Sequence, residues 1–226
     1  LSSFLGSKLN YQTGPFADYD HETPATRILA KADYNLSDRH KLSLRYNHLD
    51  SRTDVLVSNS SSLGFGNRRS RLDALNFQNS NYQIKENIRS IVGEWNAIIG
   101  SNKANNLILG YTSHDESRDS RGEFFPFVDI LKDGSTYTSF GFEPFTPNNE
   151  LRYSSLQLQN NFTIYGVNHD LTFGASIERY RSENVFFPGS QSVYTYNSLQ
   201  DFYTDVNDYA ANPNRTTSQV TLRRFQ

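Results

Sequence analysis

The sequence contains no cysteine and no methionine among its 226 residues, and it has no long apolar run. The absence of cysteine excludes a disulfide framework, a thiolate metal site and a cysteine nucleophile. A transmembrane helix needs about 18 or more consecutive apolar residues, so none is predicted. The absence of methionine predicts that the chain begins after processing or is an internal piece of a longer protein.

An excess of charge of one sign is also lacking, since 22 Lys and Arg stand against 24 Asp and Glu. Proteins that bind nucleic acid by neutralising phosphates carry a basic excess, so nucleic acid is not predicted as a partner. Aromatic residues, in contrast, are abundant, with 16 Phe and 14 Tyr. Disordered segments are poor in aromatics, and the composition therefore predicts a folded chain with a largely polar surface.

Two segments near the start of the chain alternate between apolar and polar residues. Residues 27–36 place apolar side chains at even positions, and residues 41–49 do the same after a polar turn at 37–40. A period of two residues is typical of a strand with one apolar face. Two such segments across a short turn predict a β-hairpin.

The same pattern recurs twice and begins again at the end of the chain. One further hairpin is expected over residues 87–112 and another over residues 155–178, and a last alternation starts at Val220. The alternation of residues 87–99 is less regular, because both faces of this expected strand carry apolar side chains. The sequence therefore predicts an all-β chain with six antiparallel strands and the start of a seventh.

The connections between strands fall into two length classes. Turns within each hairpin are about three to six residues long, which is normal. The links between hairpins, residues 50–86, 113–154 and 182–219, are much longer than usual loops of a compact domain. In an up-and-down sheet all long links lie at one edge, as they do in bacterial outer-membrane barrels.

Alternation fits both a soluble sheet with a buried apolar face and a barrel with a lipid-facing one. Tyr34, Tyr46, Tyr111 and Tyr165 lie near the expected strand ends, where aromatic residues mark the membrane interface. These tyrosines and the loop asymmetry favour the barrel. Because about seven strands leave two free edges and bacterial barrels close with an even number, residues 1–226 are expected to form part of a larger transmembrane β-barrel.

Two segments resemble a known family. Residues 33–46 (DYNLSDRHKLSLRY) are similar to an early strand–turn–strand in the barrel of TonB-dependent outer-membrane receptors, closest to the Oar-like group common in Bacteroidetes. Residues 193–202 (VYTYNSLQDF) are similar to a loop segment of the same group. The order and spacing of the two segments also fit, so the resemblance covers most of the chain.

The resemblance implies a barrel of 22 strands with an internal plug, located in the bacterial outer membrane, with uptake driven by TonB. The chain shows no TonB box and no plug domain, so energy coupling is expected only through a missing N-terminal part of the parent protein. The implied partners are outer-membrane lipid, TonB, an unknown transported ligand and a surface lipoprotein.

Residue types that bind metals are present but scattered. None of the five histidines has the i, i+4 spacing of a zinc site. Two acidic runs, residues 18–22 and residues 114–116 with Asp119, offer oxygen ligands for Ca²⁺ but lack the residue order of a known calcium loop. Solvated charge runs are therefore preferred to Ca²⁺ sites. No metal site, cofactor or catalytic residue is predicted, and the protein is not expected to be an enzyme.

Aromatic and arginine side chains in the long loops are the strongest functional lead. Large rigid rings are favoured at recognition surfaces, although they also pack loops onto themselves. Arginines attract anionic ligands but often pair with nearby acids. The candidate ligand-contacting residues are Arg68, Arg69, Arg71, Phe124, Phe125, Phe127, Tyr137, Phe140, Phe142 and Phe145. Residues 197–208 predict a short helix that docks its apolar side on the barrel mouth or a neighbouring loop.

These observations predict an outer-membrane receptor that binds and imports a scarce or bulky ligand. A siderophore, a cobalamin, a glycan fragment and a peptide all remain open as ligands, as does a role in export. Two alternatives belong to other classes of protein: a soluble carbohydrate-binding β-sandwich, and a small outer-membrane barrel that acts as an enzyme or adhesin.

Overall fold

The computed structural model of the protein describes residues 1–64 and 66–225. Within that part of the chain, no helix has the length and apolar content needed to cross a membrane. In chain order the elements are α1 (Ser2–Leu9), β1 (Ala25–Ser37), β2 (His40–Val55), β3 (Leu75–Asn76), the 3₁₀ helix η1 (Gln78–Ser80), β4 (Tyr82–Ile99), β5 (Lys103–Ser120), β6 (Phe127–Lys132), β7 (Ser135–Phe140), β8 (Asn149–Tyr165), β9 (Asp170–Phe186), β10 (Val193–Tyr196), α2 (Leu199–Ala211) and β11 (Leu222–Phe225).

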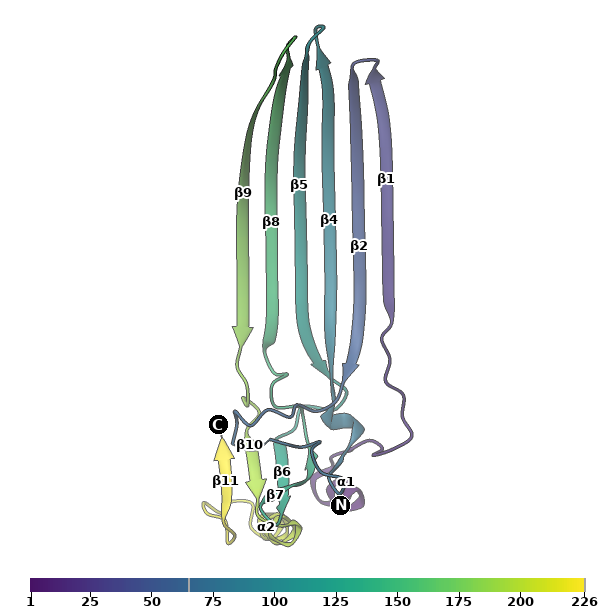
Figure 1. Cartoon of the computed structure of the whole chain (residues 1–226). Helices are drawn as coiled ribbons and strands as arrows, with labels where there is room; N and C mark the ends of the chain where they lie inside the picture. The colour runs from purple at the N-terminus through teal and green to yellow at the C-terminus, as the bar shows by residue number, and fades with distance from the viewer. Residues whose placement is uncertain (65, 226) are drawn as a thin grey trace.

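Six long strands form one antiparallel sheet in the order β1-β2-β4-β5-β8-β9. The three pairs of strands that are adjacent in sequence are joined by short turns, all of which lie at the same end of the sheet (Figure 1). The three hairpins and the up-and-down order predicted from the alternation are therefore confirmed.

One face of this sheet, here called the outer face, carries an apolar band next to the short turns. The strand register sets Leu44, Gly93, Leu109, Leu158 and Ile177 in one row across five strands. These leucines and the isoleucine are exposed, Leu109 to 52% and Ile177 to 69%. No element of the described chain shields them from the surroundings, as a soluble core would require.

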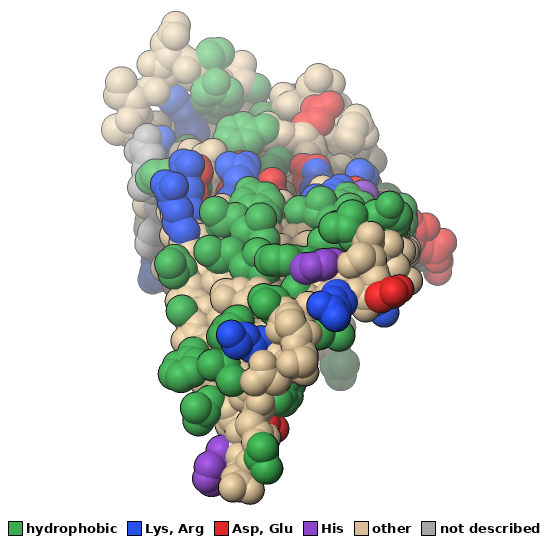
Figure 2. All heavy atoms as spheres, turned by 90° about the horizontal axis from the view of Figure 1, so that it is seen from above, with side chains coloured by type: hydrophobic (Ala, Val, Ile, Leu, Met, Phe, Trp, Pro, Cys, Tyr) green, Lys and Arg blue, Asp and Glu red, His purple; other side chains and the backbone are tan. Residues whose placement is uncertain are grey.

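The apolar band ends halfway along the strands. Its last row holds Tyr46, Ile91 and Tyr111, and in the following row Arg89 pairs opposite Ser113. Tyrosines at such a boundary form the aromatic girdle typical of membrane barrels. Seen from the turn end, hydrophobic side chains cover much of the near part of the sheet, and apart from a few turn residues the charged side chains gather in a more distant belt (Figure 2).

The strands extend well past this boundary, which corrects the loop limits expected from the sequence. β4 and β5 each contain 18 residues, whereas a barrel strand needs about 9–11 residues to cross the bilayer. The extensions are mostly polar, and those of β2 and β5 carry almost no apolar side chain that would mark a strand by alternation. The expected loops therefore contain the ends of β2, β4, β5, β8 and β9.

The remaining parts of the long links fold together with α1 and β11 at the far end of the sheet into a unit, here called the loop domain (Figure 1). A second sheet in the order β11-β10-β6-β7-β3 is its centre. β11 pairs with β10 in this second sheet, not with the long strands. The expected seventh barrel strand is therefore wrong: the large sheet has six strands within the described residues.

The loop domain has its own hydrophobic core. Buried residues from α1, both strands of the β6–β7 hairpin, β10, α2 and two connecting segments contact one another there: Leu5, Tyr11, Phe77, Val128, Ile130, Phe140, Tyr196, Phe202 and Val206. The predicted helix at residues 197–208 is confirmed as α2, which begins after Ser198, whose side chain accepts a hydrogen bond from the Asp201 amide. α1 was not expected from the sequence.

Gly141 follows the last residue of β7, at a point where its backbone lies very close to the backbone of Pro126 and Phe127. Its φ is +107°, and a Cβ atom there would lie 2.2 Å from the carbonyl oxygen of Pro126. Any other residue would be strained by both the backbone angle and the contact. The Gly141 amide donates a hydrogen bond to the hydroxyl of Tyr11, which ties the N-terminal segment to this turn.

The two sheets lie end to end, not face to face (Figure 1). A β-sandwich buries the inner faces of two stacked sheets against each other, so the soluble sandwich expected as an alternative is not the architecture of this chain. β1 and β9 each pair on one side only within the described residues, and the large sheet is therefore an open arc and not a closed barrel.

Candidate functional site

The face opposite the apolar band, here called the inner face, carries hydrogen-bonded polar side chains. The Glu94 carboxylate accepts hydrogen bonds from the amide groups of Asn96 and Asn106, at 2.9 and 2.8 Å. Ser90 and Thr112 bond across the β4–β5 pair at 2.9 Å. Such a wall can offer many weak donors and acceptors to a polar solute.

A hollow of about 550 Å³ lies on the inner face near the short turns. Its lining is largely amide and hydroxyl side chains, among them Asn35, Asn106, Asn161 and Tyr165. Tyr165 therefore faces the polar side of the sheet, which corrects its expected place among the aromatic residues of the membrane interface.

Arg68, the first predicted ligand-contacting residue, is fully buried in the loop domain. Its Nε and Nη2 donate to the two carboxylate oxygens of Asp129, both at 2.8 Å, and both side chains are inaccessible to solvent. Its Nη1 donates to the carbonyl oxygens of Ser58 and Ser60. Arg68 thus ties the link after β2 to β6 and has no open side toward a ligand.

The other predicted residues divide by exposure. Phe127, Phe140 and Phe145 are buried and pack the loop domain, as the alternative of self-packing expected. Arg71 is paired with Asp73. The remaining members of the set are partly or largely exposed, and for them ligand contact stays a prediction: Arg69, Phe124, Phe125, Tyr137 and Phe142.

Glu143 is a buried carboxyl group that sequence reasoning missed. Its Oε2 accepts hydrogen bonds from the Phe145 amide at 2.9 Å and from the Thr146 hydroxyl at 2.6 Å. Burial raises the pKa of Glu143 above its usual range, although these two hydrogen bonds and the charge of Arg118 oppose the shift. It closes a turn of the loop domain and does not face an open cavity.

A second buried network joins α2 to the last segment of the chain. The Asp205 carboxylate accepts hydrogen bonds from Tyr196 at 2.7 Å, from Arg215 at 2.6 Å and from Ser218. Burial alone would raise the pKa of Asp205, but these donors outweigh it and hold that pKa below its usual range. The network is structural, because its partners satisfy one another.

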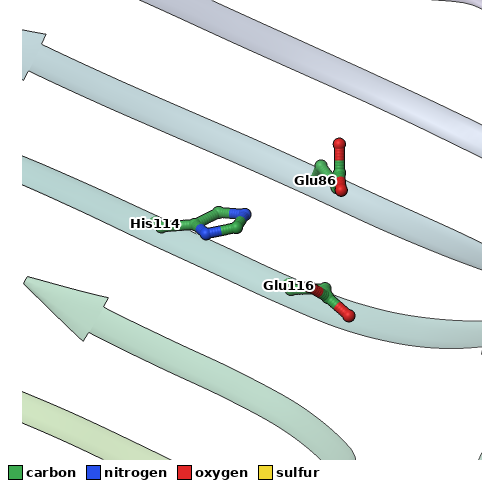
Figure 3. A group of neighbouring side chains, drawn as sticks. All are labelled: Glu86, His114 and Glu116. Carbon is green, nitrogen blue, oxygen red and sulfur yellow. The ribbon is translucent and has the colours of Figure 1, made fainter.

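Three metal-ligating side chains converge on the inner face, beyond the level of the apolar band. Glu86 comes from β4, and His114 and Glu116 come from β5 (Figure 3). One ligand atom from each lies within 4.8 Å of the others, and all three residues are partly buried. Strand alternation turns Asp115 and Asp119 to the outer face, so the acidic run expected as one possible Ca²⁺ loop is divided between two faces.

Comparison with known proteins gave one family match. A family model described as an outer membrane beta barrel domain matches residues 6–226. A search of curated proteins gave no match. The match covers the long strands and nearly all of the loop domain.

Proposed function

Since the chain belongs to the outer membrane beta barrel domain family, we propose that it forms part of the wall and the cap of a TonB-dependent receptor of the Oar-like kind. The family places the protein in the bacterial outer membrane. The finer assignment, import of a scarce or bulky ligand without catalysis, is supported by the resemblance of residues 33–46 and 193–202 and by the features described next.

The observation that carries the proposal is the apolar band of limited height on one face of strands that are much longer than a bilayer requires. Its exposed leucines match a hydrocarbon layer, and the side chains of its polar residues Asn105 and Asn160 are joined by a hydrogen bond of 2.9 Å. Unsatisfied polar groups are costly in lipid, so this pairing fits a membrane-facing wall. The polar extensions would then stand above the membrane.

The open edges of β1 and β9 support a larger barrel. In hydrocarbon an unpaired strand edge leaves backbone donors and acceptors without partners, and only closed barrels avoid this. Further strands would therefore complete the wall on both sides of this arc. A wide barrel of this kind needs an internal plug to remain closed, which is the arrangement of TonB-dependent receptors.

The loop domain would sit on the outside of the cell, since outer-membrane barrels carry their long loops there and their short turns in the periplasm. Its compact core makes it a rigid cap and not a set of loose loops. Exposed side chains such as the ring of Phe124, 67% exposed, and the guanidinium of Arg69 are then placed to meet a ligand that approaches the mouth. The inner wall would hold the ligand afterwards through multiple weak polar contacts.

Two assays on the native protein, extracted from membranes with detergent, test this proposal. The periplasmic domain of TonB, immobilised on a resin, is expected to retain the native protein. In a planar bilayer the same preparation is expected to show no steady open conductance, because a plug fills the barrel.

A steady porin-like conductance together with no retention by TonB would overturn the receptor assignment while leaving the outer-membrane barrel intact. The enzyme or adhesin alternative would gain support if the arc formed a closed barrel by itself, which analytical ultracentrifugation of the purified protein at its full length would reveal from its mass and shape.

A further inference from the structure

We propose that Glu86, His114 and Glu116 bind a divalent first-row transition metal ion, with Zn²⁺ as the representative case. The site lies on the inner face of β4 and β5, beyond the level of the apolar band. It stands on the geometry of these side chains alone, so it does not depend on the receptor assignment.

The two glutamates bring like charges close together on adjacent strands. The register sets Glu86 directly opposite Glu116 on adjacent strands, and like charges in such positions repel each other. Neither carboxylate has an ion pair or a side-chain hydrogen bond among the residues that the structure describes. On the outer face of the same strands, by contrast, Asp119 pairs with Lys85 and Asp115 pairs with Arg152. A bound cation would supply the missing neutralisation.

His114 is held through one ring nitrogen only. Its Nδ1 is hydrogen-bonded to the hydroxyl of Tyr153 on β8, while its Nε2 is buried and has no partner in the described structure. A buried nitrogen without a partner costs free energy. Histidines that bind metals commonly donate their other ring N–H to a second residue, which fixes the free lone pair toward the ion. Tyr153 would fill that role.

The combination of ligand atoms indicates which metal ions would bind. One imidazole nitrogen with two carboxylates suits Zn²⁺ and its first-row neighbours, whereas Ca²⁺ and Mg²⁺ prefer oxygen alone. Figure 3 shows both carboxylates on one flank of the imidazole ring. Ligand atoms around a four-coordinate zinc ion lie about 3.3 Å apart, given bonds of about 2.0 Å. Small rotations of the two glutamate side chains would close the present separation of up to 4.8 Å.

The nearest basic residue on the same face of β5 already has another contact. The guanidinium of Arg118 stacks over the ring of Tyr82, 4.7 Å from its centroid. Arg118 therefore does not pair with Glu116 in this structure. Three protein ligands leave a fourth position on the ion open, which water or a donor atom of a solute would occupy.

Cobalt binding tests the proposal directly. The native protein in detergent, stripped of metal with a chelator, is titrated with Co²⁺, and a visible d–d absorption band is followed to saturation. We expect one equivalent per chain, displaced by Zn²⁺ but not by Ca²⁺. Glu116→Gln should weaken the affinity on the order of a hundredfold. Asp115→Asn, one residue away on the outer face, should leave it unchanged.

Tyr153→Phe separates this site from adventitious surface binding. It keeps all three ligands and removes only the group that orients His114, so we expect a loss of affinity of about tenfold with the same absorption band. Circular dichroism and heat-modifiable gel mobility report whether each variant is folded. Equal cobalt affinity in the folded native protein and folded Glu116→Gln, or a band that His114→Gln leaves intact, would overturn the proposal.

Discussion

Removing the buried charge of Arg68 is expected to loosen the loop domain without affecting the long strands. In Arg68→Met, the Asp129 carboxylate loses two hydrogen bonds of 2.8 Å and keeps the hydroxyl of Ser139 at 2.6 Å. The carbonyl oxygens of Ser58 and Ser60 also lose a donor. An uncompensated charge then remains in a site without solvent access.

The magnitude follows from that burial. Breaking a fully buried ion pair by removing one partner costs about 3–5 kcal/mol. Since each 1.4 kcal/mol is a factor of ten in an equilibrium constant, local opening should become about 10²- to 4 × 10³-fold more frequent. Replacing both partners with apolar residues is often nearly neutral. The double variant Arg68→Met, Asp129→Leu should therefore be more stable than Arg68→Met.

Hydrogen–deuterium exchange of the native protein in detergent measures this opening at the amides of β6 and β7. We expect faster exchange there in Arg68→Met, unchanged exchange in β4 and β5, and no change anywhere in the exposed control Arg69→Met. If β6 and β7 exchange at the native rate in Arg68→Met, or if the double variant is worse than the single one, the assignment of Arg68 to the core of the loop domain is wrong.

Three further predictions concern other parts of the chain. Leu109→Arg should cost about 2–4 kcal/mol of folding stability in lipid vesicles, because Leu109 lies in the apolar band. Ser113→Arg, two rows beyond on the same face, should cost about 0–1 kcal/mol. Chemical denaturation measures both losses, and equal losses would contradict the position of the apolar band. Glu143→Gln should stabilise the loop domain at pH 8. Burial raises the pKa of Glu143 in the folded state, so its contribution is favourable at low pH and is lost as the pH rises through that pKa; the gain in exchange protection should fade toward pH 4, and a gain independent of pH would refute it. Gly141→Ala should cost about 2 kcal/mol or more in the same exchange assay, since its φ is positive and its Cβ would meet Pro126; native protection would show that the turn adapts.

The sequence predicted those parts of the fold whose signal is local. The alternation of Leu107, Leu109 and Tyr111 reports one face of one strand, so the six strands and the hairpins could be found without knowing their neighbours. The apolar spacing of Phe202 and Val206 likewise identified α2. Both kinds of pattern depend only on the period of the backbone.

The parts that could not be predicted depend on contacts between distant segments. The ends of β2 and β5 are polar on both faces, so no alternation marks them as strands. β11 pairs with β10 because that short strand offers a free edge, and nothing in residues 222–225 distinguishes this edge from that of a long strand. Arg68 is buried because it pairs with Asp129, which lies in β6, within a different long link.

The candidate metal site shows the same limit. His114 and Glu116 lie two residues apart in an acidic run of the sequence, and of this run only these two face the inner side of the sheet. The third ligand, Glu86, comes from the neighbouring strand, and its position opposite Glu116 follows from the register of the β4–β5 hairpin. Register is set by the turn and by which face of each strand is apolar. The sequence of β4 does not indicate its apolar face, because both of its faces carry apolar residues.

A nitroxide scan along β5 tests most directly whether the outer face meets hydrocarbon. In the native protein reconstituted into lipid vesicles, labels at residues 107, 109 and 111 are expected to collide with oxygen dissolved in the lipid. Labels at 113, 115 and 117, and at the inner positions 108, 110 and 112, should instead collide with a water-soluble nickel reagent. Protection of residues 107, 109 and 111 from both reagents would mean that protein covers this face and would contradict the membrane-facing wall.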